Sequence, residues 1–158
     1  MEIQVTLNGK TVRAEVRPDE LLLDFVRKQG CLSVKRGCET SNCGLCTVWL
    51  DGKPVLSCSV PAARADGRAV TTLEGVKEEA EAFGRYLAGE GAEQCGFCSP
   101  GLIMNVLAME RELSSPSAEE IREYLAGNLC RCTGYMGQMR AIEKYLNRKG
   151  GCACGENS

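Results

Sequence analysis

Histidine is absent from this chain of 158 residues. Without imidazole, the chain cannot form a Ser-His-Asp triad, a Cys-His protease pair, a His-ligated haem, a Rieske centre or a zinc site with histidine ligands. Any metal that it binds must therefore be held by thiolates, carboxylates or backbone oxygens.

Aromatic residues, net charge and long apolar runs are also scarce. The aromatic fraction is 5%, and the net charge of −2 argues against a broad phosphate-binding surface. The longest uncharged run, residues 94–109, is too short and too polar to cross a bilayer. Residues 1–5 lack the basic start and apolar stretch of a secretory signal. We therefore expect a cytoplasmic protein with no membrane span and no nucleic-acid partner.

Cysteine, by contrast, is abundant, with 11 residues in the chain. In a reducing compartment, clustered cysteines usually serve metal or redox chemistry rather than disulfide bonding. The spacing of the cysteines is therefore the first guide to function.

The first half of the chain alternates apolar and polar residues with period two, which is typical of strands. Asn8-Gly9 and Asp51-Gly52 supply the turn residues of two hairpins. Pro18-Asp19 predicts a helix start, and Gly30 the end of that helix. The strands expected from this pattern are residues 2–7, 11–16, 47–50, 54–57 and 69–72. Residues 1–75 are thus predicted to form a small α+β sheet domain.

The second half changes to helical periodicity. Ser99-Pro100 predicts an N-cap followed by a first-turn proline, and Ser117 with Glu120 predicts a capping box. The expected helices cover residues 76–89, 99–113, 117–127 and 137–148. We therefore predict an all-α four-helix bundle over residues 76–149, and a flexible tail over residues 150–158.

A first set of cysteines lies in the sheet half. Its members are Cys38, Cys43, Cys46 and Cys58, spaced C-x4-C-x2-C-x11-C. The first three reproduce the spacing of plant-type [2Fe-2S] ferredoxins, and Gly37 and Gly44 would let backbone N–H groups approach the sulfurs. The alternatives are a four-thiolate zinc site or four buried structural thiols.

A second set lies in the helical half. Its members are Cys95, Cys98, Cys130 and Cys132. Each pair falls between two predicted helices, so two helical hairpins could present four thiolates to one metal centre. Cys98 precedes a helix start, where we expect the helix dipole to favour the thiolate. Spacing alone leaves a zinc site and a redox dithiol open as alternatives.

Four stretches carry a resemblance to a known family. They are Lys35-Arg36-Gly37-Cys38, Cys43-Gly44-Leu45-Cys46-Thr47-Val48, Gln94 to Gly101 and Gly127 to Tyr135. The last two read Gln-Cys-Gly-Phe-Cys-Ser-Pro-Gly and Gly-Asn-Leu-Cys-Arg-Cys-Thr-Gly-Tyr. In these stretches the chain resembles the iron–sulfur subunit of the xanthine dehydrogenase family, the molybdenum hydroxylases.

The resemblance implies a β-grasp ferredoxin domain followed by a four-helix domain, each with one [2Fe-2S] cluster on its four cysteines. The helical-domain cluster would lie next to a molybdopterin cofactor on a large subunit, and Gln94 and Cys132 would approach the pterin. The other cluster would pass electrons toward FAD on a medium subunit. The chain would thus be the electron-transfer subunit of an oxidoreductase, with no substrate chemistry of its own.

This chain departs from the family pattern in its tail, Cys152-Ala153-Cys154, and in two places before it. Residues 39–42, Glu-Thr-Ser-Asn, replace a loop that is usually rich in glycine, and we expect Asn42 to adopt the left-handed conformation there. Gln138 stands at a position where isoleucine is common in the family, so we expect this side chain to make a more polar contact here.

Three cysteines fall outside both sets. Cys31 is expected to be a small buried hydrophobic residue, while Cys152 and Cys154 lie on the predicted tail as unligated thiols. Two other functions remain as alternatives: a cysteine-rich zinc scaffold, and a free-standing ferredoxin-type carrier.

Overall fold

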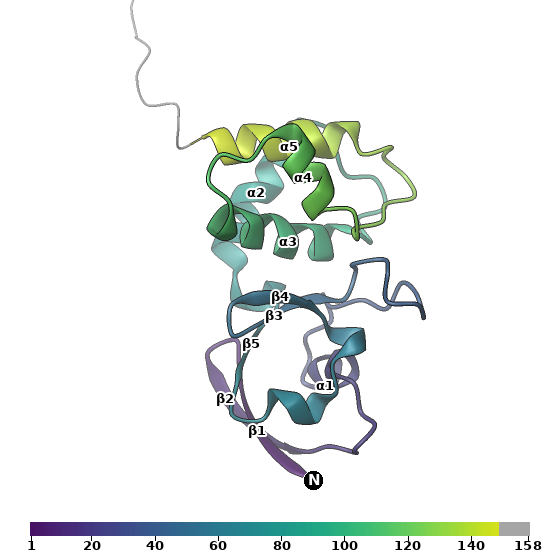
Figure 1. Ribbon diagram of the computed structural model, residues 1–158, viewed down its shortest axis with the longest axis vertical. Helices are drawn as coiled ribbons and strands as arrows, with labels where there is room; N and C mark the ends of the chain where they lie inside the picture. Colours follow the sequence, from purple (N-terminus) through teal and green to yellow (C-terminus); the bar gives the residue numbers. More distant parts are fainter. Residues whose placement is uncertain (149–158) are drawn as a thin grey trace, which may run out of the picture.

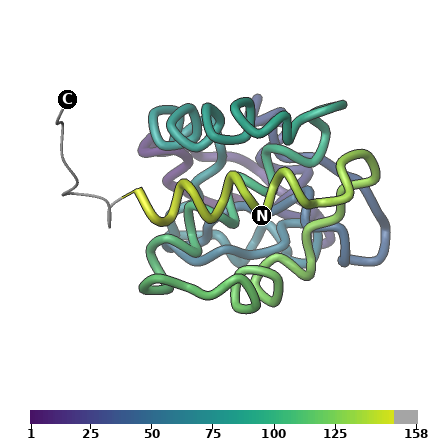
Figure 2. The backbone as a smooth tube through the Cα atoms, turned by 90° about the horizontal axis from the view of Figure 1, so that it is seen from above, coloured from purple at the N-terminus to yellow at the C-terminus, as the bar shows by residue number. Residues whose placement is uncertain are grey.

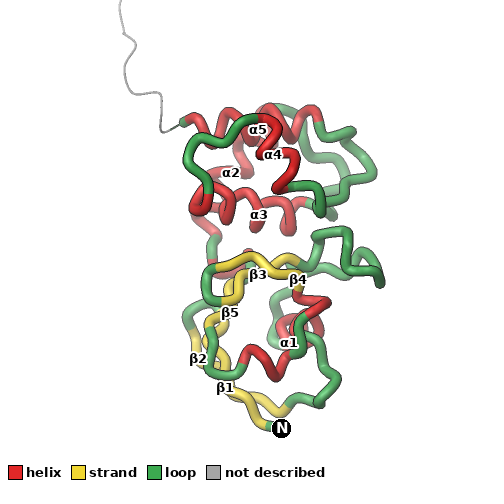
Figure 3. The backbone as a smooth tube through the Cα atoms, viewed as in Figure 1, coloured by secondary structure: helices red, strands yellow, loops and turns green. Residues whose placement is uncertain are grey.

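The computed structural model describes residues 1–148, and the expectations for Cys152 and Cys154 lie outside these residues. A sheet half and a helical half are stacked along the long axis of the molecule (Figure 1). Figure 3 shows that the strands are confined to the first half, whereas helices fill the second. Within residues 1–148, none of the helices is both long enough and apolar enough to cross a membrane.

The sheet half is a mixed five-stranded sheet with one α-helix, α1 (Leu22–Lys28). The strands are β1 (Glu2–Leu7), β2 (Lys10–Glu15), β3 (Thr47–Leu50), β4 (Lys53–Leu56) and β5 (Ala69–Thr71). Their order is β2-β1-β5-β3-β4, with β1 and β5 parallel and the other neighbours antiparallel. This is the predicted α+β ferredoxin-type architecture. Short 3-10 turns, η1 (Ser57–Ser59), η2 (Ala62–Ala65) and η3 (Leu73–Gly75), follow β4 and β5.

Local sequence explains the first hairpin. In β1, Ile3, Val5 and Leu7 are buried and the residues between them are exposed. Asn8 and Gly9 both adopt positive φ, at 50° and 80°, which is the geometry of a two-residue hairpin turn. The strand pair and its turn are therefore as predicted.

The start of α1 is not where the sequence predicted it. We expected the helix to begin at Pro18-Asp19, but it begins at Leu22. Leu21 is extended and forms a β-bridge with Pro61, and the Leu22 amide donates to the Val60 carbonyl at 2.7 Å. This pairing with a distant segment holds Leu21 in an extended conformation, and Pro18-Asp19 forms a turn closed by the Glu20 amide donating to the Arg17 carbonyl at 3.1 Å.

The helical half consists of α2 (Lys77–Gly89), α3 (Ser99–Glu112), α4 (Ala118–Tyr124) and α5 (Met136–Asn147). Seen from above, α5 crosses the molecule with α2 and α4 on opposite sides (Figure 2). Helix α3 is the central element, since residues 101–109 are all buried. Four helices in this half confirm the prediction.

The two predicted helix starts have different outcomes. Ser117 and Glu120 form the expected capping box, with both reciprocal hydrogen bonds present. Ser99, in contrast, is the first residue of α3 rather than its N-cap, and that position is taken by Cys98, which makes no side-chain cap. The cysteine therefore lies at the helix terminus itself.

Trp49 of β3 joins the two halves. Its side chain is buried in the hydrophobic core of the helical half, where its indole Nε1 donates to the Met104 carbonyl at 3.0 Å. The Arg111 guanidinium lies 4.1 Å from the centre of its ring. A residue of the sheet is thus part of the core of the helices, which favours a single fixed arrangement of the two halves.

Two helical glycines provide a test of this packing. A β-carbon on Gly101 would lie 2.4 Å from the Gly44 carbonyl oxygen, whereas one on Gly84 would meet no atom within 4 Å. We expect Gly101→Ala to destabilise the protein by about 1–3 kcal/mol through overpacking. Gly84→Ala should stabilise it by about 0.5–1 kcal/mol, because alanine favours the helix. Urea unfolding followed by circular dichroism measures both, and equal midpoints would contradict the close contact.

Candidate metal centres

The first cysteine set gathers beside the sheet. Cys38, Cys43 and Cys46 lie on the segment between α1 and β3, and Cys58 lies in η1, just after β4. The Cys38 and Cys43 side chains contact each other, as do those of Cys46 and Cys58. The structure therefore brings these four predicted ligands together as two pairs of thiols.

Backbone amides lower the pKa of these thiols, whereas burial raises it. N–H groups of Asn42 and Thr40 point at the Cys38 sulfur and lower its pKa to about 6. Burial raises the pKa of Cys43, although the Leu45 and Gly37 amides partly oppose it. Burial also raises the pKa of Cys46, to about 11. The amide of Gly37 thus approaches a sulfur as predicted.

The loop that departs from the family pattern has a specific conformation. The left-handed residue is Ser41, with φ 57°, and not Asn42 as we expected. The Ser41 hydroxyl accepts a hydrogen bond from the Cys58 thiol at 3.6 Å and another from Ser59 at 2.8 Å. These contacts hold Ser41 in place, so the left-handed position falls one residue earlier than predicted.

The second cysteine set gathers at the ends of α3 and α5. Cys95 and Cys98 precede α3, while Cys130 and Cys132 lie between α4 and α5. The Cys132 and Cys95 sulfurs are 3.5 Å apart, and Cys98 contacts Cys130. Cys95 and Cys132 are exposed, whereas the other two are half-buried. This set is again two pairs.

The expectation for Cys98 was wrong. Burial, followed by the contact with Cys130, raises the pKa of Cys98 to about 11 despite its place at the helix N-terminus. For Cys130, burial is outweighed by hydrogen bonds from the Thr133 hydroxyl and amide, so its pKa is lowered. The pKa of Cys95 is lowered first by a hydrogen bond from the Phe97 amide and second by one from the Cys132 thiol. The same thiol–thiol contact raises the pKa of Cys132.

Paired thiols are a suitable donor set for a binuclear cluster. Each iron of a [2Fe-2S] cluster takes two protein ligands, whereas a structural zinc site places four around one ion. Within residues 1–148, no three His, Cys, Asp or Glu side chains converge on a single ion position. Both cysteine sets thus fit iron–sulfur clusters in the type and pairing of their ligands.

Comparison with known proteins agrees with this geometry. Residues 5–88 match the 2Fe-2S iron-sulfur cluster binding domain, and residues 72–143 match the [2Fe-2S] binding domain. The chain is 46% identical over 145 residues to the xanthine dehydrogenase iron-sulfur-binding subunit of Escherichia coli O157:H7, covering 84% of this chain and 86% of that one. The chain belongs to the iron–sulfur subunits of the xanthine dehydrogenase family.

Further relatives agree with this assignment. The iron–sulfur subunit is 39% identical over 149 residues to the nicotinate dehydrogenase small FeS subunit of Eubacterium barkeri, covering 92% of this chain and 95% of that one. It superposes on a chain of quinoline 2-oxidoreductase from Pseudomonas putida with a TM-score of 0.86 and 36% identity, covering 96% and 97% of the two chains. It is therefore an electron-transfer subunit of a molybdenum hydroxylase, with two [2Fe-2S]-binding domains and partner subunits.

The two cysteine sets of the iron–sulfur subunit lie close together. One cavity of about 450 Å³ is lined by Cys38 and Cys43 of the first set and by all four cysteines of the second. The Leu129 amide, next to Cys130, donates to the Cys43 carbonyl at 2.9 Å. A backbone hydrogen bond therefore joins the loops that carry the two sets.

Sequence reasoning missed several side chains that touch the cysteines. The Thr133 hydroxyl lies 3.1 Å from the Cys130 sulfur, and the Tyr135 hydroxyl accepts from the Cys130 amide at 2.9 Å. Gln138 donates to the Cys98 sulfur at 3.8 Å. Adjacency to Cys132 could have indicated Thr133, whereas Gln138 was noted only as a polar departure from the family pattern and its contact with Cys98 was not predicted.

The remaining predicted residues have simple environments. Gln94 is exposed beside Cys95. Cys31 is buried, with 5% exposure, in the hydrophobic core of the sheet half, as predicted. The Lys35 ammonium lies 5.1 Å from the centre of the Phe97 ring. A residue near Cys38 of the first set therefore contacts a residue between Cys95 and Cys98 of the second.

The difference in pKa between two cysteines of the first set is testable in iron-free protein. The pKa of Cys38 is about 6 and that of Cys46 about 11, so the thiolate of Cys38 forms at much lower pH. Because the thiolate is the nucleophile, iodoacetamide should modify Cys38 well before Cys46 at neutral pH. Mass spectrometry of the two peptides across a pH series measures this. Equal rates at neutral pH would contradict the amide contacts of Cys38.

Proposed function

We propose that this subunit takes electrons from a molybdopterin centre on a separate large subunit and passes them toward FAD on a third subunit, or toward another acceptor. The observation that carries the proposal is that two thiols of the first set, Cys38 and Cys43, line one cavity together with all four thiols of the second set. A hydrogen bond from the Leu129 amide to the Cys43 carbonyl joins the two loops. Two adjacent one-electron sites in one chain suit relay between cofactors on different partners.

The proposal assigns eight ligands. Cys38, Cys43, Cys46 and Cys58 hold the first cluster within residues 1–75, and Cys95, Cys98, Cys130 and Cys132 hold the second within residues 76–149. Support comes from the contacts between the thiols and from the two matching domains. Because iron ligands must stay reduced and unbridged, we also infer a cytoplasmic location.

The helical half is proposed as the entry side for electrons. Cys95 and Cys132 are exposed there, and large apolar side chains surround them. These are Phe97, Leu129 and Tyr135, between 40% and 47% exposed. Clustered exposed apolar residues mark contact surfaces, so this patch supports docking of the large subunit against the second cluster.

At this surface, we propose that Gln94 and Cys132 contact the pterin. Gln94 is exposed and is held in place by its neighbour, the ligand Cys95. An amide side chain both donates and accepts hydrogen bonds, which suits the mixed edge of a pterin. Cys132 is also exposed, and its sulfur lies 3.5 Å from that of Cys95, the neighbour of Gln94.

The cluster assignment is tested by ligand removal. Anaerobically purified protein should contain about four iron atoms per chain, as two binuclear clusters require. Cys43→Ser and Cys98→Ser should each abolish one electron paramagnetic resonance signal of the reduced protein and spare the other, because neither set borrows a ligand from the other.

Cys31→Ala is the matched control, since Cys31 is a buried cysteine outside both sets. It should retain both signals and all the iron. Stoichiometric zinc in place of iron would favour the zinc scaffold, and loss of both signals from one folded variant would contradict the two-site assignment. If no large molybdenum subunit co-purifies with the protein, that result would favour a free-standing ferredoxin-type carrier.

The proposed pterin contact predicts a separate effect for Gln94→Ala. The change leaves a partner group on the cofactor without its hydrogen bond, which costs about 1–3 kcal/mol in the assembled complex. Both clusters should assemble, but molybdopterin retention or reduction of the clusters by substrate should fall. Rapid-mixing kinetics and molybdenum analysis measure these quantities. Glu93→Ala, an exposed neighbour, is the control, and matching wild-type values in both variants would remove Gln94 from the contact.

A further inference from the structure

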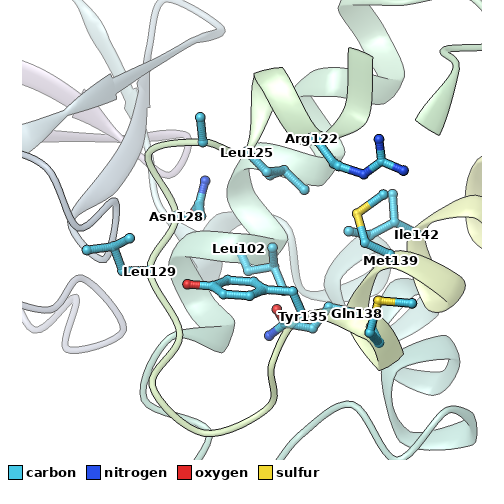
Figure 4. Close-up of a pocket in the computed structure, with 11 residues that line it drawn as sticks. Leu102, Arg122, Leu125, Asn128, Leu129, Tyr135, Gln138, Met139 and Ile142 are labelled. Atoms are coloured by element: carbon cyan, nitrogen blue, oxygen red, sulfur yellow. The ribbon is translucent and has the colours of Figure 1, made fainter. Parts of the chain in front are cut away.

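Gln138 is a buried polar residue beside the second cysteine set. It lies in the first turn of α5 and is only 4% exposed. Its Nε2 donates to the Cys98 sulfur at 3.8 Å. Figure 4 shows Gln138 beside Tyr135 among the side chains that line a neighbouring cavity of about 320 Å³. The rest of that lining is largely aliphatic, with Leu102, Met139 and Ile142 near Gln138.

We propose that Gln138 is a positioning residue that raises the reduction potential of the cluster in the helical half. It would do so through the N–H···S hydrogen bond to Cys98. The proposal rests on the proposed function, because it takes Cys98 as a ligand of that cluster.

The physical reason is the charge that accompanies reduction. An added electron increases the negative charge on the ligand sulfurs, and an N–H dipole aimed at one of them stabilises that charge. Hydrogen bonds to the sulfurs and solvent exposure are established determinants of iron–sulfur potentials. Because Gln138 is buried and Cys98 is half-buried, this hydrogen bond is screened less than one at the surface.

The side-chain environment also argues for an oriented donor. A buried amide without a partner is unfavourable, and the aliphatic neighbours of Gln138 provide none. The sulfur of Cys98 lies 40 positions earlier in the chain, so the bond connects α5 to the start of α3. The carboxamide can therefore hold one orientation toward the ligand, which outer-shell residues need in order to influence a metal centre.

The test compares two variants of the full chain loaded with both clusters. Gln138→Met keeps the approximate size and removes the donor. Met139→Leu changes the next residue, which lines the same cavity, without a change in hydrogen bonding. Redox titrations followed by electron paramagnetic resonance give the potential of each cluster separately.

Gln138→Met should lower the reduction equilibrium constant of the helical-half cluster by about tenfold, equivalent to 59 mV for one electron. The cluster of the sheet half should keep its wild-type potential, and Met139→Leu should shift neither. A purely structural role for Gln138 predicts wild-type potentials in all three proteins, and that result would overturn the proposal.

Failure of the proposed function would look different. In that case Cys98→Ser protein would retain the second signal, so no cluster would depend on the sulfur that Gln138 contacts. If Gln138→Met assembles only one cluster, Gln138→Asn is titrated instead. Its amide is one methylene shorter and withdraws from the sulfur, so the potential should again fall, and an unchanged value would overturn the proposal.

Discussion

Backbone segments of the two halves are in direct contact, with no room for a side chain between them. This contact fixes the position of one half of the subunit relative to the other. A β-carbon on Gly44 would lie 2.3 Å from the Gly127 carbonyl oxygen, and one on Gly101 would meet Gly44 in the same way. Asn105 joins the same region by donating to Thr47 at 3.0 Å and to the Asn128 side chain at 3.2 Å. Because these segments adjoin Cys43 and Cys130, the contact also fixes how far apart the two metal centres lie.

A second constraint is the balance between burial and amide donors around each thiol. Burial alone disfavours the thiolate that a metal requires. The inner thiols Cys46 and Cys98 show this effect, whereas amides of the flanking loop favour the thiolate at Cys38. In each set, the thiols therefore differ in their readiness to ionise, and under the proposed ligand assignment metal binding would supply the free energy that deprotonates the inner ones.

Much of this architecture could be predicted from the sequence, because the signals are local. Hairpin turns, the capping box and the cysteine spacing each depend on residues within a few positions of one another. Two of the errors occurred where a distant segment decides the outcome. The start of α1 depends on the bridge from Leu21 to Pro61, and Ser41 adopts its conformation against Cys58. The contact of Gln138 with Cys98 could not be predicted from either local stretch, since their spatial proximity depends on the packing of α5 on α3.

The fluorescence of Trp49 reports on the junction between the two halves. It is the single tryptophan of the chain, and its indole lies in the helical core although its backbone belongs to the sheet. Separation of the halves would expose the ring to water and remove its hydrogen bond to Met104 while each core remained folded. Intrinsic fluorescence therefore reports on the seam between the two cluster domains, and it can be monitored independently of the helical content of the protein.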